Sequence, residues 1–285
     1  AVSKSFRYGI VSPIPGPGDV EALPRYFRRH ADDPWTAVEE ILGVGGKVLW
    51  VSNTVDRCRA TATLATMRAH CPLVYHSRFR YCDRVERHRD VVAAFERSCA
   101  ALALTTQVAE MSLDLSAALL VTDIAPIPAL IQRLGRLNRR SRPKDPEPPK
   151  PFVVVRPPRA LPYEESELVA AERWLENVGD GPVSQADLVA RWPTDGTEPP
   201  REEPCAWLDG GFETDPRQVR EASPGMTILL PDDADAIRAG QEYPARVALP
   251  MNPPKAGVAR ALRAARRVRH LPVVPEGLVD YNFAL

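Results

Sequence analysis

The sequence predicts an α/β protein in which helices flank a parallel sheet, followed by a smaller mixed α/β accessory domain. Between Lys47 and Arg140, short β-branched apolar runs alternate with helical patterns, as expected for a parallel sheet covered by helices. The chain has 285 residues, 44% of them hydrophobic and 26% charged, which is enough for two domains of ordinary size. A proline-rich charged stretch, SRPKDPEPPKP, cannot hold a helix and indicates a semi-rigid linker or domain edge, with a boundary near residue 145. A further strand at 152–155 would extend the first domain to about residue 157.

The elements of the first predicted domain alternate in a regular order. The expected strands are residues 48–52, 73–76, 101–105, 119–122 and 152–155. A helix is expected over 55–69, and a second one begins with Asp83 as its N-cap and turns Val85, Val92 and Phe95 inward. Because the carboxyl ends of parallel strands meet at one edge of a sheet, the polar residues that follow these strands are expected to share one site.

The run QRLGRLNRR at 132–140 closes this series and predicts a short helix rich in arginine. At about 3.6 residues per turn, Gln132, Arg136 and Arg139 share one face of that helix. Arginine binds phosphate oxygens bidentately and keeps its charge when water is excluded, so this face indicates phosphate chemistry. The alternative is a solvated basic helix. Arg133 points away from Arg136, so its role stays open between ligand contact and a salt bridge within the domain.

The composition of the chain indicates where the protein is located and which kinds of site it lacks. There is no apolar run long enough to span a membrane and no basic start followed by an apolar segment, so a cytoplasmic protein is expected. The five cysteines form no C-x-x-C pair, which argues against a disulfide framework and a zinc site. The chain carries 21 basic and 15 acidic residues through Asp145, against 16 and 22 after it. The arginine run therefore lies in a basic half.

Three ranges describe the predicted domains: a lead-in at 1–46, the sheet domain at 47–157 and the accessory domain at 158–285. In the last range the pattern predicts a helix over 161–178 and a buried strand over 226–230. Residues 255–269 read as a basic amphipathic helix. That helix suits a lid on nucleic acid, a docking element for an acidic protein surface, or a face that is merely solvated.

Three segments carry a resemblance to a known family. VLWVSNT, TTQVAEMSLDL and QRLGRLNRR resemble motifs four, five and six of the second RecA-like domain of superfamily 2 helicases, in the expected order. YHSRF at 75–79 and the API-x-x-L-I-Q-R run are most similar to the CRISPR-associated helicase-nuclease of type I systems. Ser112 and Asn138 depart from the general superfamily pattern but fit that branch. The resemblance implies a RecA-like fold over 47–157.

The motifs that would complete an ATP site are missing from the sequence. It has no G-x-x-x-x-G-K-[ST] phosphate loop, no Asp-Glu pair after an apolar strand in its first half and no His-Asp dipeptide. The resemblance therefore implies an upstream RecA-like domain that supplies the phosphate loop and the magnesium ligand, and a metal-dependent nuclease domain. ATP and Mg²⁺ would be shared with that missing half. The chain alone is expected to be inactive and to bind no metal.

The resemblance assigns roles to individual residues. Arg136 and Arg139 would be arginine fingers against the γ-phosphate, Gln132 would couple the nucleotide state to DNA, Asp114 would contact the ribose, and Arg133 is a weaker member of this group. The expected DNA track consists of Ser52, Asn53, His76, Ser77, Arg78, Thr105 and Thr106. Each of these polar residues has a structural alternative, as a cap, a turn residue or a satisfied buried group.

The function expected from the resemblance is that of an ATP-dependent single-stranded-DNA translocase of CRISPR interference. Its partners would be single-stranded DNA, the attached nuclease domain and a CRISPR RNA-guided surveillance complex, and it would not act at a membrane. Two alternatives remain at this stage. One is a superfamily 2 helicase of another branch, acting in repair or on RNA. The other is a non-catalytic binding module derived from half a helicase.

Overall fold

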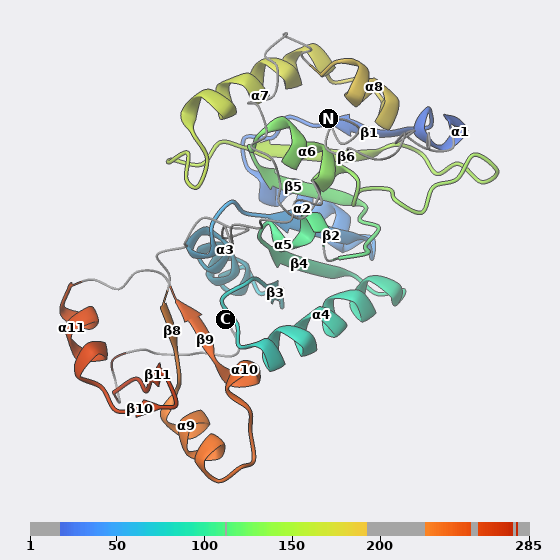
Figure 1. Cartoon of the computed structure of the whole chain (residues 1–285). Coiled ribbons are helices and arrows are strands. Elements are labelled where there is room, and N and C mark those ends of the chain that lie inside the picture. The colour runs from blue at the N-terminus through green and yellow to red at the C-terminus, as the bar shows by residue number, and fades with distance from the viewer. Residues whose placement is uncertain (1–17, 112, 193–225, 252–255, 276–277, 279–285) are drawn as a thin grey trace, which may run out of the picture.

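Seven strands form one sheet in the order β3-β4-β2-β5-β6-β1-β7 (Figure 1). The computed structural model describes residues 18–111, 113–192, 226–251, 256–275 and 278. The strands are β1 (Pro24–Arg28), β2 (Lys47–Val51), β3 (Leu73–Tyr75), β4 (Ala101–Thr105), β5 (Leu119–Asp123), β6 (Lys150–Val155) and β7 (Val183–Ser184). Neighbouring strands are parallel except for β1 and β7, which pair antiparallel. This confirms the predicted α/β class.

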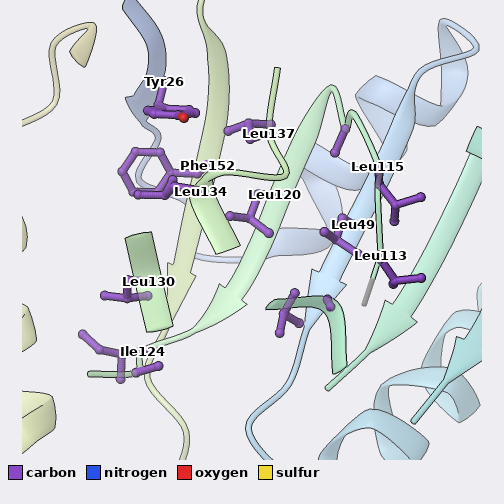
Figure 2. Packing of buried hydrophobic residues seen from close by; sticks show 14 of the residues in the cluster. Tyr26, Leu49, Leu113, Leu115, Leu120, Ile124, Leu130, Leu134, Leu137 and Phe152 are labelled. Atoms are coloured by element: carbon purple, nitrogen blue, oxygen red, sulfur yellow. The ribbon is translucent and has the colours of Figure 1, made fainter. Parts of the chain in front are cut away.

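The central strands are apolar on both faces because helices cover both faces. Every residue of β4 and β5 is buried, as is usual for strands inside a parallel sheet. In β2 successive side chains alternate, with Leu49 and Val51 in one hydrophobic cluster and Val48 and Trp50 in the other. Figure 2 shows Leu49 and Leu120 in the first of these clusters.

The two faces of the sheet are covered by different helices. The helices are α1 (Gly18–Glu21), α2 (Pro34–Gly43), α3 (Val55–Met67), α4 (Tyr81–Glu96), α5 (Val108–Met111), α6 (Ile127–Leu134), α7 (Glu165–Val178) and α8 (Gln185–Ala190). Buried residues of α2 and α3 join the cluster around Trp50. Buried residues of α4 to α8 join the cluster around Leu49. The side chains of Asp33 and Thr54 cap α2 and α3, which explains where these two helices begin.

The sheet extends beyond the predicted range of 47–157 on both sides. β1 lies between β6 and β7, so residues 24–28 are part of the sheet instead of a lead-in. Helix α7 places Leu168, Trp174 and Leu175 in the same cluster as the sheet. The proline-rich stretch therefore connects β5 and α6 to β6 within one folded unit. The boundary predicted near residue 145 falls inside this unit.

Two helix predictions were wrong in detail. Asp83 does not cap α4; Arg80 occupies the N-cap, and Asp83 lies inside the first turn, where it accepts a hydrogen bond from the Nε of Arg80 at 2.6 Å. The arginine run is not a single helix, because α6 ends at Leu134 with Gly135 as its C-cap. The chain then turns through Asn138, at φ +50°, and exchanges backbone hydrogen bonds with Ala117. Those bonds replace the ones that a longer helix would have made.

The C-terminal part is a smaller unit built on two short antiparallel pairs. β8 (Met226–Ile228) pairs with β9 (Leu249–Met251), and β10 (Arg267–Val268) with β11 (Leu271–Pro272). Around them lie α9 (Pro231–Arg238), α10 (Pro244–Val247) and α11 (Ala256–Ala264). The predicted basic helix is thus shorter than 255–269, because the chain becomes a strand at Arg267; residue 255 lies outside the described residues.

This unit packs against the beginning of α4. Arg80 donates from Nη1 to Asp233 of α9 at 2.7 Å, and Cys82 packs against the hydrophobic cluster that holds Ile237. Figure 1 shows α10 beside α4. Among the described residues, none of the helices has the length and apolar character needed to cross a bilayer.

Candidate nucleotide and nucleic-acid site

A cavity of about 360 Å³ collects the polar residues of the arginine run. Gln132, Gly135, Arg136 and Arg139 line it, together with Glu110 of α5. The remaining lining residues come from α1, β1, α6 and α8 and are Val20, Glu21, Arg25, Tyr26, Ile131 and Gln185. The turn after α6 therefore brings Gln132, Arg136 and Arg139 together, as the single-helix prediction expected, but by a different backbone path.

Arg136 is held by two backbone carbonyls. Its Nε donates to the oxygen of Ala109 at 3.0 Å and its Nη2 to that of Glu110 at 2.5 Å. Nη1 makes no hydrogen bond within the part of the chain that the structure describes. Burial lowers the pKa of Arg136, and the positive charge of Arg139 lowers it further. The guanidinium is therefore fixed at its base, with one nitrogen left to donate to an anion.

Arg139 and Asp114 form an exposed ion pair beside the cavity. The Nε of Arg139 lies 2.7 Å from the Oδ1 of Asp114, and their side chains are 44% and 85% exposed. Gln132 is exposed on α6. An exposed pair of this kind contributes at most about 1 kcal/mol, so a ligand can separate it at little cost.

Arg133 turns away from the cavity into the protein. Its side chain is 0% exposed, and its Nε donates to Glu110 at 2.9 Å. Nη1 donates to the side chains of Asn53 and Thr122 and to the backbone oxygen of Asp123, at 2.9 to 3.1 Å. The salt bridge within the domain, one of the two possibilities left open by the sequence, is the one that the structure contains.

Glu110 connects the two arginines and was missed in the sequence. Its carboxylate accepts from Arg133, its backbone oxygen accepts from Arg136, and it lines the cavity. The TTQVAE run contained it, but nothing in the spacing distinguished it from a helix-surface residue. Tyr26 also lines the cavity and donates to the Oε1 of Gln185 at 3.1 Å. Burial raises the pKa of Tyr26. The sequence did not predict this contact, because Tyr26 in β1 and Gln185 in α8 are far apart in the chain.

The predicted DNA-track residues lie at or just after the ends of β2, β3 and β4, but most of them are buried. Exposed fractions are 3% or less for Ser52, Asn53, His76, Thr105 and Thr106. The backbone N–H of Ser52 donates to the oxygen of Thr105 at 2.9 Å, which brings the ends of β2 and β4 together. Ser77 is exposed and Arg78 is half-buried. The loop after β3 thus presents the accessible members of the set.

The loop after β3 is shaped by a stacked ring pair. The rings of His76 and Phe79 are 4.1 Å apart and nearly parallel, at 1°. The Nδ1 of His76 accepts a hydrogen bond from the backbone N–H of Arg78 at 3.2 Å. His76 therefore orders the turn that presents Ser77 and Arg78.

Asn53 is fully committed to internal contacts. Its side-chain nitrogen donates to the oxygen of Ile124 at 2.7 Å, and its Oδ1 accepts from Arg133 at 3.1 Å. Its backbone N–H donates to Asp123 at 2.8 Å, and Asp123 also pairs with Arg57. Arg57 was not among the predicted site residues; its spacing placed it only as a helix residue after the strand.

Comparison with known proteins identifies the family. The C-terminal model of the CRISPR-associated nuclease/helicase Cas3 matches residues 44–142, the range that contains all the residues named in the predicted site. The putative CRISPR-associated nuclease/helicase Cas3 of Myxococcus xanthus is 52% identical over 272 residues, which cover 94% of this chain and 36% of that protein. The chain matches the C-terminal region of Cas3.

The likeness to other Cas3 proteins is more local. The CRISPR-associated endonuclease/helicase Cas3 of Thermus thermophilus is 42% identical over 92 residues, which cover 31% of this chain and 10% of that protein. The chain thus spans about a third, or less, of the length of these curated relatives.

The fold also matches solved structures, one of Cas3 and one of a surveillance complex. The crystal structure of T. fusca Cas3-AMPPNP has a TM-score of 0.60 at 18% identity and covers 96% of this chain and 41% of that one. A chain of a CRISPR RNA-guided surveillance complex, pre-nicking, has a TM-score of 0.53 at 17% identity and covers 90% of this chain and 41% of that one. At these identities the likeness establishes the fold, a RecA-like helicase C-terminal domain.

The residues of this Cas3 region fit the anionic part of a nucleotide better than a metal ion. Arg136, Arg139 and Gln132 offer donors to one cavity. Across the described residues no group of three or more His, Cys, Asp or Glu side chains gathers in a way that could hold a metal. The carboxylates of Glu110 and Asp114 are paired with Arg133 and Arg139.

Proposed function

We propose that this chain is the C-terminal half of an ATP-dependent single-stranded-DNA translocase of type I CRISPR interference. One observation carries the proposal: the guanidinium of Arg136 is anchored by two carbonyls at a cavity that it shares with Gln132 and Arg139. An arginine fixed in this way, with a nitrogen left over, suits an anion that arrives from another domain.

The proposed task of Arg136 and Arg139 is to stabilise charge at the γ-phosphate. Phosphoryl transfer spreads negative charge over the equatorial oxygens, and arginines placed against that charge increase the rate by a factor of about 10³ to 10⁵. Two carbonyls hold Arg136 before any ligand arrives, so little ordering is needed when the charge develops. Arg139 would leave its exposed partner Asp114 to reach the same phosphate, and Asp114 would then be available to the ribose.

ATP and Mg²⁺ would be shared with an upstream RecA-like domain. The T. fusca Cas3 structure contains AMPPNP, an ATP analogue, and the present chain covers 41% of that protein. The phosphate loop and the magnesium ligands would come from the part that this chain does not span. The combination of these two parts is called the complete motor below.

The proposed polymer substrate is single-stranded DNA, contacted at the carboxyl edge of the sheet. The exposed Ser77 and the half-buried Arg78 are suited to backbone-phosphate contact, which positions a strand without reading its sequence. By likeness to the Cas3 relatives and to the pre-nicking surveillance complex, the motor would act in the cytoplasm with an attached nuclease domain and a CRISPR RNA-guided complex. Ser52, Thr105 and Thr106 are buried and would contribute only if the loops around them open.

Replacement of Arg136 tests the proposal. In the complete motor, we expect Arg136→Ala to lower the rate of DNA-stimulated ATP hydrolysis about 10³-fold or more while the affinity for single-stranded DNA stays within about twofold. Arg140→Ala is the matched control, because Arg140 is exposed and its nearest acid, Glu96, is 4.0 Å away. Hydrolysis rates that are equal in the two variants would remove the finger assignment.

A further inference from the structure

We propose that Arg57, in the first turn of the helix α3 that follows β2, is the DNA-phosphate contact at this end of the strand, and that Asp123 holds its guanidinium in position. The proposal rests on the proposed function, because it names a residue of the same DNA track. It replaces Asn53, which the sequence had suggested for this segment.

The Arg57–Asp123 pair is a fork-to-fork contact. The Nε of Arg57 donates to the Oδ2 of Asp123 at 2.8 Å, and the Nη2 donates to the Oδ1 at 2.6 Å. Asp123 is 0% exposed and lies at the end of β5, the strand next to β2. A bidentate pair fixes the plane of the guanidinium as well as its position.

The same carboxylate also fixes the short segment between β2 and α3, the helix that carries Arg57. Its Oδ2 accepts the backbone N–H of Asn53 at 2.8 Å. The side chain of Asn53 is held in turn by Ile124 and Arg133. Asn53 therefore has its amide occupied inside the protein, and the segment's donor for an external ligand has to come from elsewhere.

Arg57 is the residue of this network that reaches the surface. Its side chain is 30% exposed, whereas those of Asp123 and Arg133 are 0% exposed. Two of its three nitrogens face Asp123, and Nη1 makes no hydrogen bond among the described residues. Hydrogen bonding to Asp123 raises the pKa of Arg57, so it stays charged. The pair therefore has a buried negative end and a partly exposed positive end, with Nη1 left over as a donor.

The ligand class follows from where that donor lies. Arg57 follows β2, and β2 is parallel to β4, which is in turn parallel to β3. The loop after β3 carries Ser77 and Arg78, the accessible residues of the predicted track. A guanidinium with a fixed plane and one outward nitrogen fits a non-bridging phosphate oxygen of a strand that crosses these strand ends.

A purely structural role is the competing explanation. A buried carboxylate needs a partner, and Arg57 would supply one even if no DNA approached it. The two roles differ in the salt dependence of DNA binding, because each phosphate neutralised on a single strand changes the slope of log K against log salt by about 0.7. A residue that only stabilises the fold leaves this slope unchanged.

The experiment measures the affinity of the complete motor for an unstructured oligonucleotide at salt concentrations of about 50 to 200 mM. We expect Arg57→Gln to weaken binding about tenfold at the lowest salt and to reduce the slope by about 0.7. Arg57→Lys should keep most of the slope, since it keeps the charge. Arg59→Gln is the matched control: Arg59 is an exposed arginine of the same helix, and no ion pair of its side chain occurs among the described residues.

A second variant guards against loss of folding. Asp123→Asn combined with Arg57→Gln removes both charges, so that no unpaired carboxylate stays buried, and its thermal unfolding is compared with that of the wild type. We expect a folded double variant with the same reduced slope. A wild-type slope in every folded Arg57 variant would overturn the inference alone. If the wild-type motor binds no single-stranded DNA at all, the proposed function fails and the inference fails with it.

Discussion

Arg133 and Arg136 are three residues apart, yet their guanidiniums have opposite surroundings. Arg133 is fully buried and bonds to five groups, among them the carboxylate of Glu110 and the hydroxyl of Tyr163. Arg136 lies at a cavity and bonds to two carbonyls. We therefore expect Arg133 to stabilise the domain and Arg136 to bind an external anion.

Substitution of Arg133 should therefore lower the stability of the domain more than substitution of Arg136. We expect Arg133→Met to lower the free energy of unfolding by about 3 to 5 kcal/mol, because it leaves the carboxylate of Glu110 without its partner. Urea unfolding of this chain measures the effect. Arg133→Met combined with Glu110→Gln should recover part of the loss. A cost for Arg133→Met no larger than that of Arg136→Met would contradict the assignment.

The sequence was sufficient to select residues of the candidate site, but it did not predict the contacts that these residues make. The phosphate chemistry of arginine and the spacing of the run were sufficient to select Gln132, Arg136 and Arg139 as one group. The contacts of Asn53 and Glu110 depend on the backbone oxygen of Ile124, which follows β5, and on the side chain of Arg133 in α6, and these residues are distant in sequence. Local spacing carries no information on such contacts.

At the scale of elements, α7 decides how far the sheet unit extends. Its capping box, formed by Glu164 and Glu167, fixes the first turn. Leu168, Trp174 and Leu175 are at most 1% exposed and pack in the cluster that also holds Leu130 of α6. The helix therefore covers the sheet instead of starting an accessory domain.

A substitution in α7 tests this arrangement. We expect Leu175→Ala to lower the free energy of unfolding of the sheet unit by about 2 to 5 kcal/mol, since it leaves a cavity in a packed core. The neighbouring Glu176 is exposed, so Glu176→Ala should change stability by less than about 0.5 kcal/mol. Denaturant unfolding monitored on a signal of the sheet unit gives both values. A near-neutral Leu175→Ala would place α7 outside that core.

Elements with strong local patterns were predictable, and short strands were not. β2, β4 and β5 are continuous apolar runs, and α3 follows a capping threonine. β1 and β7 pair across more than 150 positions of sequence, and β7 has only two residues. Such pairing depends on tertiary contacts. The early end of α6 also depends on them, because Ala117 supplies the backbone groups that draw the chain out of the helix.

At the scale of the whole molecule, one hydrogen-bonded network joins the cavity to the strand ends. Arg136 holds the backbone of α5, Glu110 of α5 holds Arg133, and Arg133 holds Asn53 beside Asp123 and Arg57. The C-terminal unit contacts the sheet unit near β3, the strand at one edge of the sheet. Asp233 of the C-terminal unit pairs there with Arg80, at the beginning of α4. The proposed nucleotide and DNA contacts thus belong to one sheet unit.

We propose above that this sheet unit is half of an ATP motor. The most direct test is the rate of ATP hydrolysis, with and without single-stranded DNA, for this chain alone and for the same chain joined to the upstream RecA-like domain. We expect no hydrolysis by the chain alone and DNA-stimulated hydrolysis by the joined protein. A joined protein that hydrolyses no ATP but still binds DNA or a protein partner would rule out a motor and favour a binding module derived from a helicase.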